Sequence, residues 1–117
     1  MNDIKLPDFD ELFSIINSIY ELSRKKALLE IEIKLKESEI TIKASSDEKY
    51  FQNNKPPSQT YIDNAWKYSG FDGELIPLRK ELVEITSQLE FFKMKYYLYT
   101  NIMDVWRTHE ASKRALA

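Results

Sequence analysis

The stretch "LIPLRKELVEITSQLEFFKMKYYLYTNIMDVW", residues 75–106, carries the strongest structural pattern in this chain of 117 residues. Alternate steps of three and four residues meet a large apolar or aromatic side chain each time, at Leu75, Leu78, Leu82, Ile85, Leu89, Phe92, Tyr96, Tyr99, Met103 and Trp106. Side chains with this spacing share one face of an α-helix, so the pattern predicts a heptad seam. Pro77 fits the first helical turn. We therefore expect a long C-terminal helix over residues 74–113.

A second set of apolar residues lies beside the seam in the later half of the same stretch, at Phe91, Leu98, Ile102 and Val105. This half of the helix thus has a much wider apolar face than the first half. A wide apolar face needs more than one packing partner. Because the seam is expected to pack on the first helix of the same chain, these four residues are predicted to form an oligomer interface.

Residues 8–44 predict a first long helix, with one open alternative. Asp8 can cap its N-terminus, and Glu11 follows three residues later as in a capping box. Within it, "LEIEIKLKESEITIK" alternates apolar and charged residues, which is also the pattern of a β-hairpin over residues 28–43. A hairpin would need a turn near "KESE", which contains no Gly, Asn or Pro. We favour the helix on that ground.

The middle of the chain has a polar, turn-rich composition. "SSDEKYFQNNKPPSQ" indicates a loop, set at residues 45–57. A short helix is expected over residues 58–70, capped by Ser58 or Thr60 and stopped by Gly70. The predicted fold is therefore all-α: one helical domain over residues 1–117, built as a long helical hairpin of helix, loop, short helix and long C-terminal helix.

Composition excludes several classes of function. The chain has no cysteine, one histidine, only two glycines and a net charge of −2. It offers no glycine-rich phosphate loop and no nucleophile beside a base and an oxyanion loop, so we expect no enzyme, no metal and no cofactor. The N-terminus lacks the basic and apolar regions of a signal peptide, and no window is apolar enough to span a membrane. A cytoplasmic protein without membrane contact is expected.

The polar middle combines cations with aromatic rings. Cations neutralise phosphates and rings stack on unpaired bases, which makes this region a candidate site for single-stranded DNA. The candidates are Lys43, Lys49, Lys55, Tyr50 and Phe51. The alternative is that the nearby rings Tyr61, Trp66 and Phe71 pack the short helix while the lysines stay solvated. A second basic cluster, Arg24, Lys25 and Lys26, points in three directions on a helix, so it would act only by repetition in an oligomer.

Three stretches resemble the UvsY-type recombination mediator proteins of T4-like bacteriophages: "SRKKALLEIE" (23–32), "KASSDEKYF" (43–51) and "IMDVWRTHEASK" (102–113). The resemblance implies an all-helical, non-enzymatic, ring-like homo-oligomer. Such a protein binds single-stranded DNA, helps to displace the single-strand-binding protein and loads a RecA-like recombinase. The family's DNA-contacting stretch corresponds to Lys43 and Lys49, and its oligomerising helix to residues 89–106. Asp47 and Glu48 depart from a basic middle, which weakens the expected DNA binding.

The sequence therefore favours two possible functions. The first is a recombination mediator, placed in the host cytoplasm if the chain is encoded by a phage. The alternative is a helical oligomer that binds only proteins, as a phage assembly chaperone, an adaptor or an inhibitor. A structural coiled-coil subunit is a third, weaker option.

Overall fold

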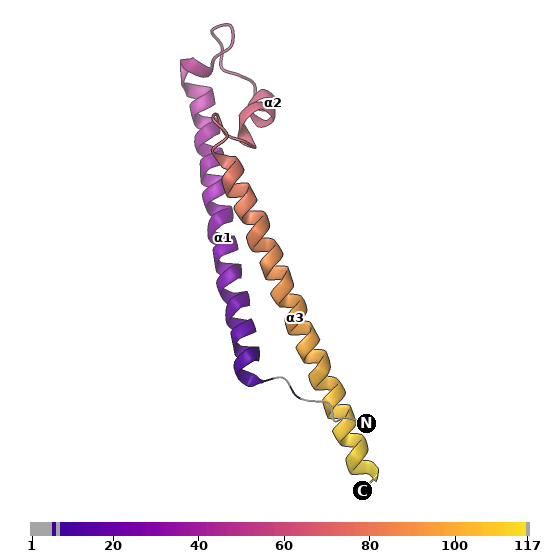
Figure 1. The fold of residues 1–117 in the computed structure, drawn as a ribbon. Helices are drawn as coiled ribbons and strands as arrows, with labels where there is room; N and C mark the ends of the chain where they lie inside the picture. Colours follow the sequence, from indigo (N-terminus) through magenta and orange to yellow (C-terminus); the bar gives the residue numbers. More distant parts are fainter. Residues whose placement is uncertain (1–5, 7, 117) are drawn as a thin grey trace. The chain divides into compact units, whose positions relative to one another are not determined.

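The computed structural model describes residue 6 and residues 8–116, and most of them are helical (Figure 1). The elements are α1 (Phe9–Ser46), the 3₁₀ turn η1 (Glu48–Tyr50), α2 (Gln59–Ile62), the π-helical segment η2 (Asp63–Lys67) and α3 (Leu75–Leu116). The described residues contain no β-strand, only an isolated bridge between Gln52 and Lys55. The prediction of an all-α chain with a long C-terminal helix is confirmed. The ends of the expected 1–117 domain, residues 1–5, 7 and 117, lie outside the described residues.

Helix α1 runs without a break through residues 28–43, so the helix is correct there and the β-hairpin is wrong. Its N-terminus is capped as expected, because the Asp8 carboxylate accepts a hydrogen bond from the Asp10 N–H at 3.1 Å. The helix continues two residues beyond the expected end, to Ser46, whose hydroxyl donates to the Ile42 carbonyl at 2.6 Å. Asp47 then caps η1 by accepting from the Lys49 N–H at 3.0 Å.

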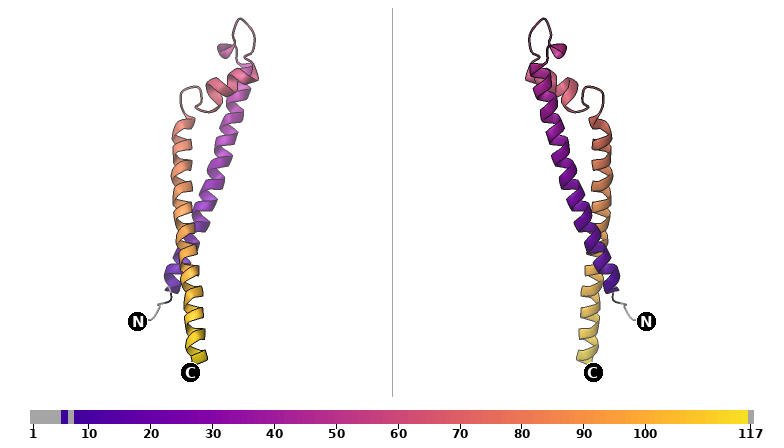
Figure 2. Two further views of the ribbon diagram at one scale, coloured as in Figure 1. Left: turned by 90° about the vertical axis from the view of Figure 1, so that its right-hand side faces the viewer. Right: turned by 90° about the vertical axis from the view of Figure 1, so that its left-hand side faces the viewer.

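The chain divides into two compact units. Unit 1 comprises Met1–Arg24 and Thr86–Ala117, and unit 2 comprises Lys25–Ile85. Each long helix contributes one part to each unit. Figure 2 shows α1 and α3 from two further sides, with the loop and the short helical stretch α2–η2 joining them in unit 2.

In unit 1, the first part of α1 packs on the second part of α3. Its buried apolar residues are Ile15 and Leu22 from α1 and Leu89 from α3. The rest of the seam in this unit is half-buried: Phe92, Tyr96, Tyr99, Met103 and Trp106. Glu11 on α1 makes two polar contacts with α3. Its carboxylate accepts a hydrogen bond from the Tyr99 hydroxyl and forms an ion pair with Lys95 at 3.8 Å. That hydrogen bond raises the pKa of Tyr99 above its ordinary value.

In unit 2, the core is larger and includes the connecting segment. The buried apolar residues are Leu29, Ile33, Ile40, Ala44, Ile62, Leu75 and Ile85. Ile62 comes from α2, which is capped by the Ser58 hydroxyl accepting from the Tyr61 N–H at 3.2 Å. Beside it, four rings touch one another: Tyr50, Tyr61, Trp66 and Phe71. The expected short helix is thus two pieces, α2 and η2, and the wider π turn places Trp66 in this ring cluster.

In unit 2, the side chains of Arg79 and Glu74 hold the segment between α2–η2 and α3 in place by hydrogen bonds. Arg79 donates to the Tyr68 carbonyl at 2.6 Å and to Glu37 on α1 at 2.9 Å, and its guanidinium lies 4.3 Å from the Tyr68 ring centre. Glu74 accepts hydrogen bonds from the N–H groups of Phe71 and Asp72. Gly70 ends the helical stretch with φ of +89°, as the sequence predicted.

Candidate functional site

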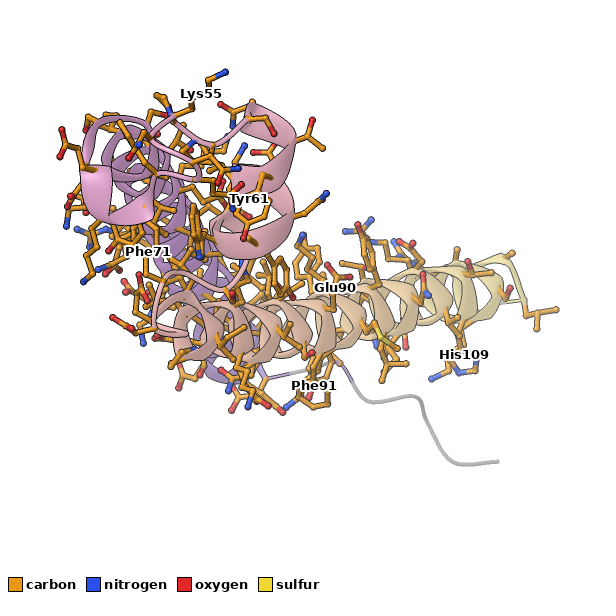
Figure 3. All side chains as sticks on the ribbon, turned by 90° about the horizontal axis from the view of Figure 1, so that it is seen from above. Lys55, Tyr61, Phe71, Glu90, Phe91 and His109 are labelled. Carbon is orange, nitrogen blue, oxygen red and sulfur yellow. The ribbon has the colours of Figure 1, made fainter. Side chains whose placement is uncertain are left out.

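The three lysines of the predicted DNA site all lie in unit 2 and are all exposed. Lys43 is in the last turn of α1 and Lys49 is in η1. Lys55 follows a tight turn in which Asn53 and Asn54 adopt φ of 52° and 61°, closed by paired backbone hydrogen bonds between Gln52 and Lys55. Asparagine tolerates this left-handed conformation. The turn holds Lys55 outward at the edge of the loop (Figure 3).

The two predicted stacking rings differ in their surroundings. The Tyr50 ring stacks on Phe71 with centroids 4.0 Å apart and meets Trp66 edge-on at 5.4 Å. Lys49 lies over the Tyr50 ring at 5.6 Å. Tyr50 therefore belongs to the ring cluster, with Phe71 on one of its faces. Phe51 is half-buried and is not part of that cluster. The nearby ring contacts match the packing alternative for Trp66 and Phe71.

Charges of both signs surround these lysines. Asp47 and Glu48 are exposed next to Lys49, so the local excess of positive charge is small. A groove of about 510 Å³ lies between α1 and the α2–η2 stretch and carries two further lysines, Lys34 and Lys67. Lys67 is 3.8 Å from Asp63. The groove was not predicted as a site, because its cations come from segments far apart in the sequence.

The second basic cluster does not converge on one surface. Arg24 and Lys25 are exposed, whereas Lys26 is half-buried. Arg24 belongs to unit 1, and Lys25 and Lys26 belong to unit 2. Consecutive helical positions diverge by about 100°, so each side chain leaves α1 in a different direction.

The predicted oligomer interface is largely open in the single chain. Phe91, Leu98 and Val105 are 60%, 57% and 53% exposed, and Ile102 is half-buried. Sequence reasoning missed Met94, which is 69% exposed and fits between Phe91 and Leu98 by steps of three and four. These five residues are called the α3 stripe below. They lie on a face of α3 that is roughly 130° around the helix axis from the seam, since about 3.6 residues complete each turn.

Helix α1 also exposes large apolar side chains on the side away from its buried residues. In unit 1 these are Phe9, Phe13, Ile16 and Tyr20, and in unit 2 they are Leu28, Ile31, Leu35 and Ile42. Each set repeats at steps of three, four or seven residues. Monomeric soluble proteins rarely expose this much contiguous apolar surface, and such faces mark interaction sites.

Other kinds of site find little support in the described residues. No group of three or more His, Cys, Asp or Glu side chains there could hold a metal ion. His109 is half-buried near the end of α3. None of the described helices combines the length and apolar character needed to cross a bilayer.

Comparisons with known proteins assign no family to the chain. No family model matches it, and neither a curated protein nor a solved structure is significantly similar to it.

Proposed function

We propose that this chain is a non-enzymatic recombination mediator, a ring-like helical homo-oligomer that binds single-stranded DNA. In this proposal it helps to displace the single-strand-binding protein and promotes loading of a RecA-like recombinase. The steps that involve other proteins rest on the resemblance of residues 23–32, 43–51 and 102–113 to UvsY-type mediators. The binding and assembly steps also have support from the geometry of the chain.

The observation that carries the DNA-binding part is the exposure of Lys43, Lys49 and Lys55 in one unit. A cation can release counterions from a phosphate backbone only if it reaches the solvent. The three lysines are spread along 13 residues that include a tight turn and no long apolar run. Phe51 lies between them, close enough in sequence to offer a ring to an unpaired base.

Self-association has separate support from the exposed apolar faces. A single copy has few cations in excess around its loop, so its affinity for DNA is expected to be weak. Repetition of the loop in a closed assembly would add weak contacts by raising the effective concentration of each site. The α3 stripe gives the chain a surface through which such an assembly can form.

The test is a salt titration of binding to a fluorescent oligo-dT strand, with the mass of the protein measured in the same samples. We expect Lys43→Ala with Lys49→Ala to weaken binding by about tenfold or more at low salt and to reduce the slope of log Kd against log salt by about one to two. The matched control is Lys80→Ala with Arg114→Ala, which removes the same charge from exposed basic residues outside the loop and the groove. Equal losses in both variants, or no binding by the unmodified chain, would contradict the proposal.

A second candidate is a helical oligomer that binds only proteins, such as a phage assembly chaperone, an adaptor or an inhibitor. The exposed acids Asp47 and Glu48 beside Lys49 favour it, because they oppose a phosphate backbone. It predicts the same assembly without any affinity for oligo-dT. The titration above therefore separates the two candidates directly.

A further inference from the structure

The α3 stripe has a spacing that is symmetric about its central residue. Relative to Leu98, the other members lie seven and four residues before it and four and seven residues after it. We propose that the α3 stripe binds the same stripe of a second copy in an antiparallel arrangement, with a two-fold axis at Leu98. Phe91 then faces Val105, Met94 faces Ile102, and Leu98 faces Leu98. This inference rests on the self-association in the proposed function and is independent of DNA binding.

Side-chain size favours the antiparallel direction over a parallel one. In the antiparallel pair, the bulky Phe91 meets the small Val105, so the distance between the two helices stays even along the contact. In a parallel pair in register, Phe91 would face Phe91 and Val105 would face Val105.

The size of the contact fits a specific pair of chains. Four of the five stripe residues are more than half exposed. Covering the stripe and its rim on two copies buries on the order of 1,000 Å² in total, near the lower bound for a specific interface. An interface with two-fold symmetry joins chains in pairs. A closed assembly that uses it contains an even number of subunits.

Cysteine cross-linking tests the symmetry, because the natural chain has no cysteine. Oxidation of Leu98→Cys is expected to give a covalent dimer in most of the protein. Phe91→Cys alone should stay monomeric on a denaturing gel, since its two copies would be about 20 Å apart. A mixture of Phe91→Cys and Val105→Cys should give a dimer that contains one chain of each. Val83→Cys, at a valine earlier in α3 that is at least as exposed as Leu98 and Val105, is the control and should not cross-link.

The outcomes separate this inference from the proposed function. If Phe91→Cys cross-links to itself as well as Leu98→Cys does, the helices are parallel and the inference is overturned. If the chain self-associates by mass but Leu98→Cys does not cross-link, another surface forms the interface and the inference is again overturned. If the unmodified chain is a monomer, both this inference and the assembly part of the proposed function fail. Binding to oligo-dT does not enter any of these results.

Discussion

The two parts of α3 lie in different units and have different outward faces. In unit 2, from Leu75 to Ile85, the exposed side is mostly charged, with Lys80, Glu81 and Glu84 beside Val83. In unit 1 the exposed side carries the apolar α3 stripe. Unit 2 also fastens its connection through the directed hydrogen bonds of Arg79 and Glu74. One end of the helix therefore completes a fold within the chain, whereas the other end leaves a row of apolar side chains exposed.

A charge placed in the α3 stripe should have a larger effect on self-association than the same charge placed in the part of α3 that lies in unit 2. Leu98→Glu puts an unpaired carboxylate where apolar contact is expected, and the burial of such a group costs several kcal/mol. We expect self-association to weaken by at least about 100-fold, as measured by sedimentation equilibrium. Val83→Glu changes an exposed residue of similar type in unit 2 and should leave the mass unchanged. Both variants should retain the helical circular dichroism signal. If Leu98→Glu forms an oligomer of normal mass, the α3 stripe does not take part in self-association.

The close packing of unit 2 can be tested at its two glycines. Gly70 has φ of +89°, and a Cβ there would overlap the Glu74 carboxyl group. Gly70→Ala therefore adds backbone strain and disturbs the hydrogen bonds of Glu74, and we expect a loss of about 2–3 kcal/mol in unfolding free energy. Gly73→Ala is the matched control, because φ is +74° there but no atom beyond its two chain neighbours lies within 4 Å of the added Cβ. It should cost about 1 kcal/mol. Equal losses in urea unfolding would show that Glu74 moves aside without cost.

The ring cluster of unit 2 gives a third, smaller test. Tyr50→Ala removes the stack on Phe71 and the edge contact with Trp66, so we expect a loss of about 2 kcal/mol in unfolding free energy. Phe51 lies outside the cluster, so the loss in unfolding free energy for Phe51→Ala should be about half as large or less. Chemical denaturation followed by tryptophan fluorescence measures both. A larger effect from Phe51→Ala would mean that the loop, rather than the ring cluster, holds this region together.

Acid should weaken unit 2 slightly through Glu74. Hydrogen bonds from backbone N–H groups, with that of Asp72 the strongest, hold the pKa of Glu74 below its ordinary value of 4.5. The unfolded chain therefore binds this proton more readily than the folded chain. The stabilisation is complete above pH 4.5 and is lost as the pH falls through the lower, folded pKa. The difference in unfolding free energy between the natural chain and Glu74→Gln should shrink below pH 4.5, and a constant difference would argue against this role.

Features that depend on local pattern could be predicted from the sequence. None of the ten seam positions from Leu75 to Trp106 is exposed, because a long run of steps of three and four fixes one face of a helix. The caps at Asp8 and Ser58 and the stop at Gly70 follow from local backbone chemistry in the same way. The choice of helix over hairpin at residues 28–43 followed from the lack of turn-forming residues.

Features that depend on contacts between distant residues could not be predicted. The π turn at Asp63–Lys67 accompanies the packing of Trp66 among rings contributed by other segments, such as Tyr50 and Phe71. The roles of Arg79 and Tyr50 likewise depend on partners 42 and 21 residues away, Glu37 and Phe71. Met94 does not belong with these features, because its place in the α3 stripe follows from its spacing in the sequence and could have been predicted. For the candidate DNA site, the sequence indicated the exposed lysines but not the ring contacts that engage Tyr50.

The Arg79 contacts also bear on the order in which the chain can fold as it is made. Arg79 is 42 residues beyond its partner Glu37, and it also holds the carbonyl of Tyr68. During synthesis, α1 and the ring cluster emerge first, but the contacts that fasten them cannot form until the first turns of α3 have left the ribosome. Closing such a long loop precedes any gain from the contacts within it. Arg79→Lys, which keeps the charge but loses the forked geometry, should therefore lower the protease resistance that nascent chains gain once these turns have emerged.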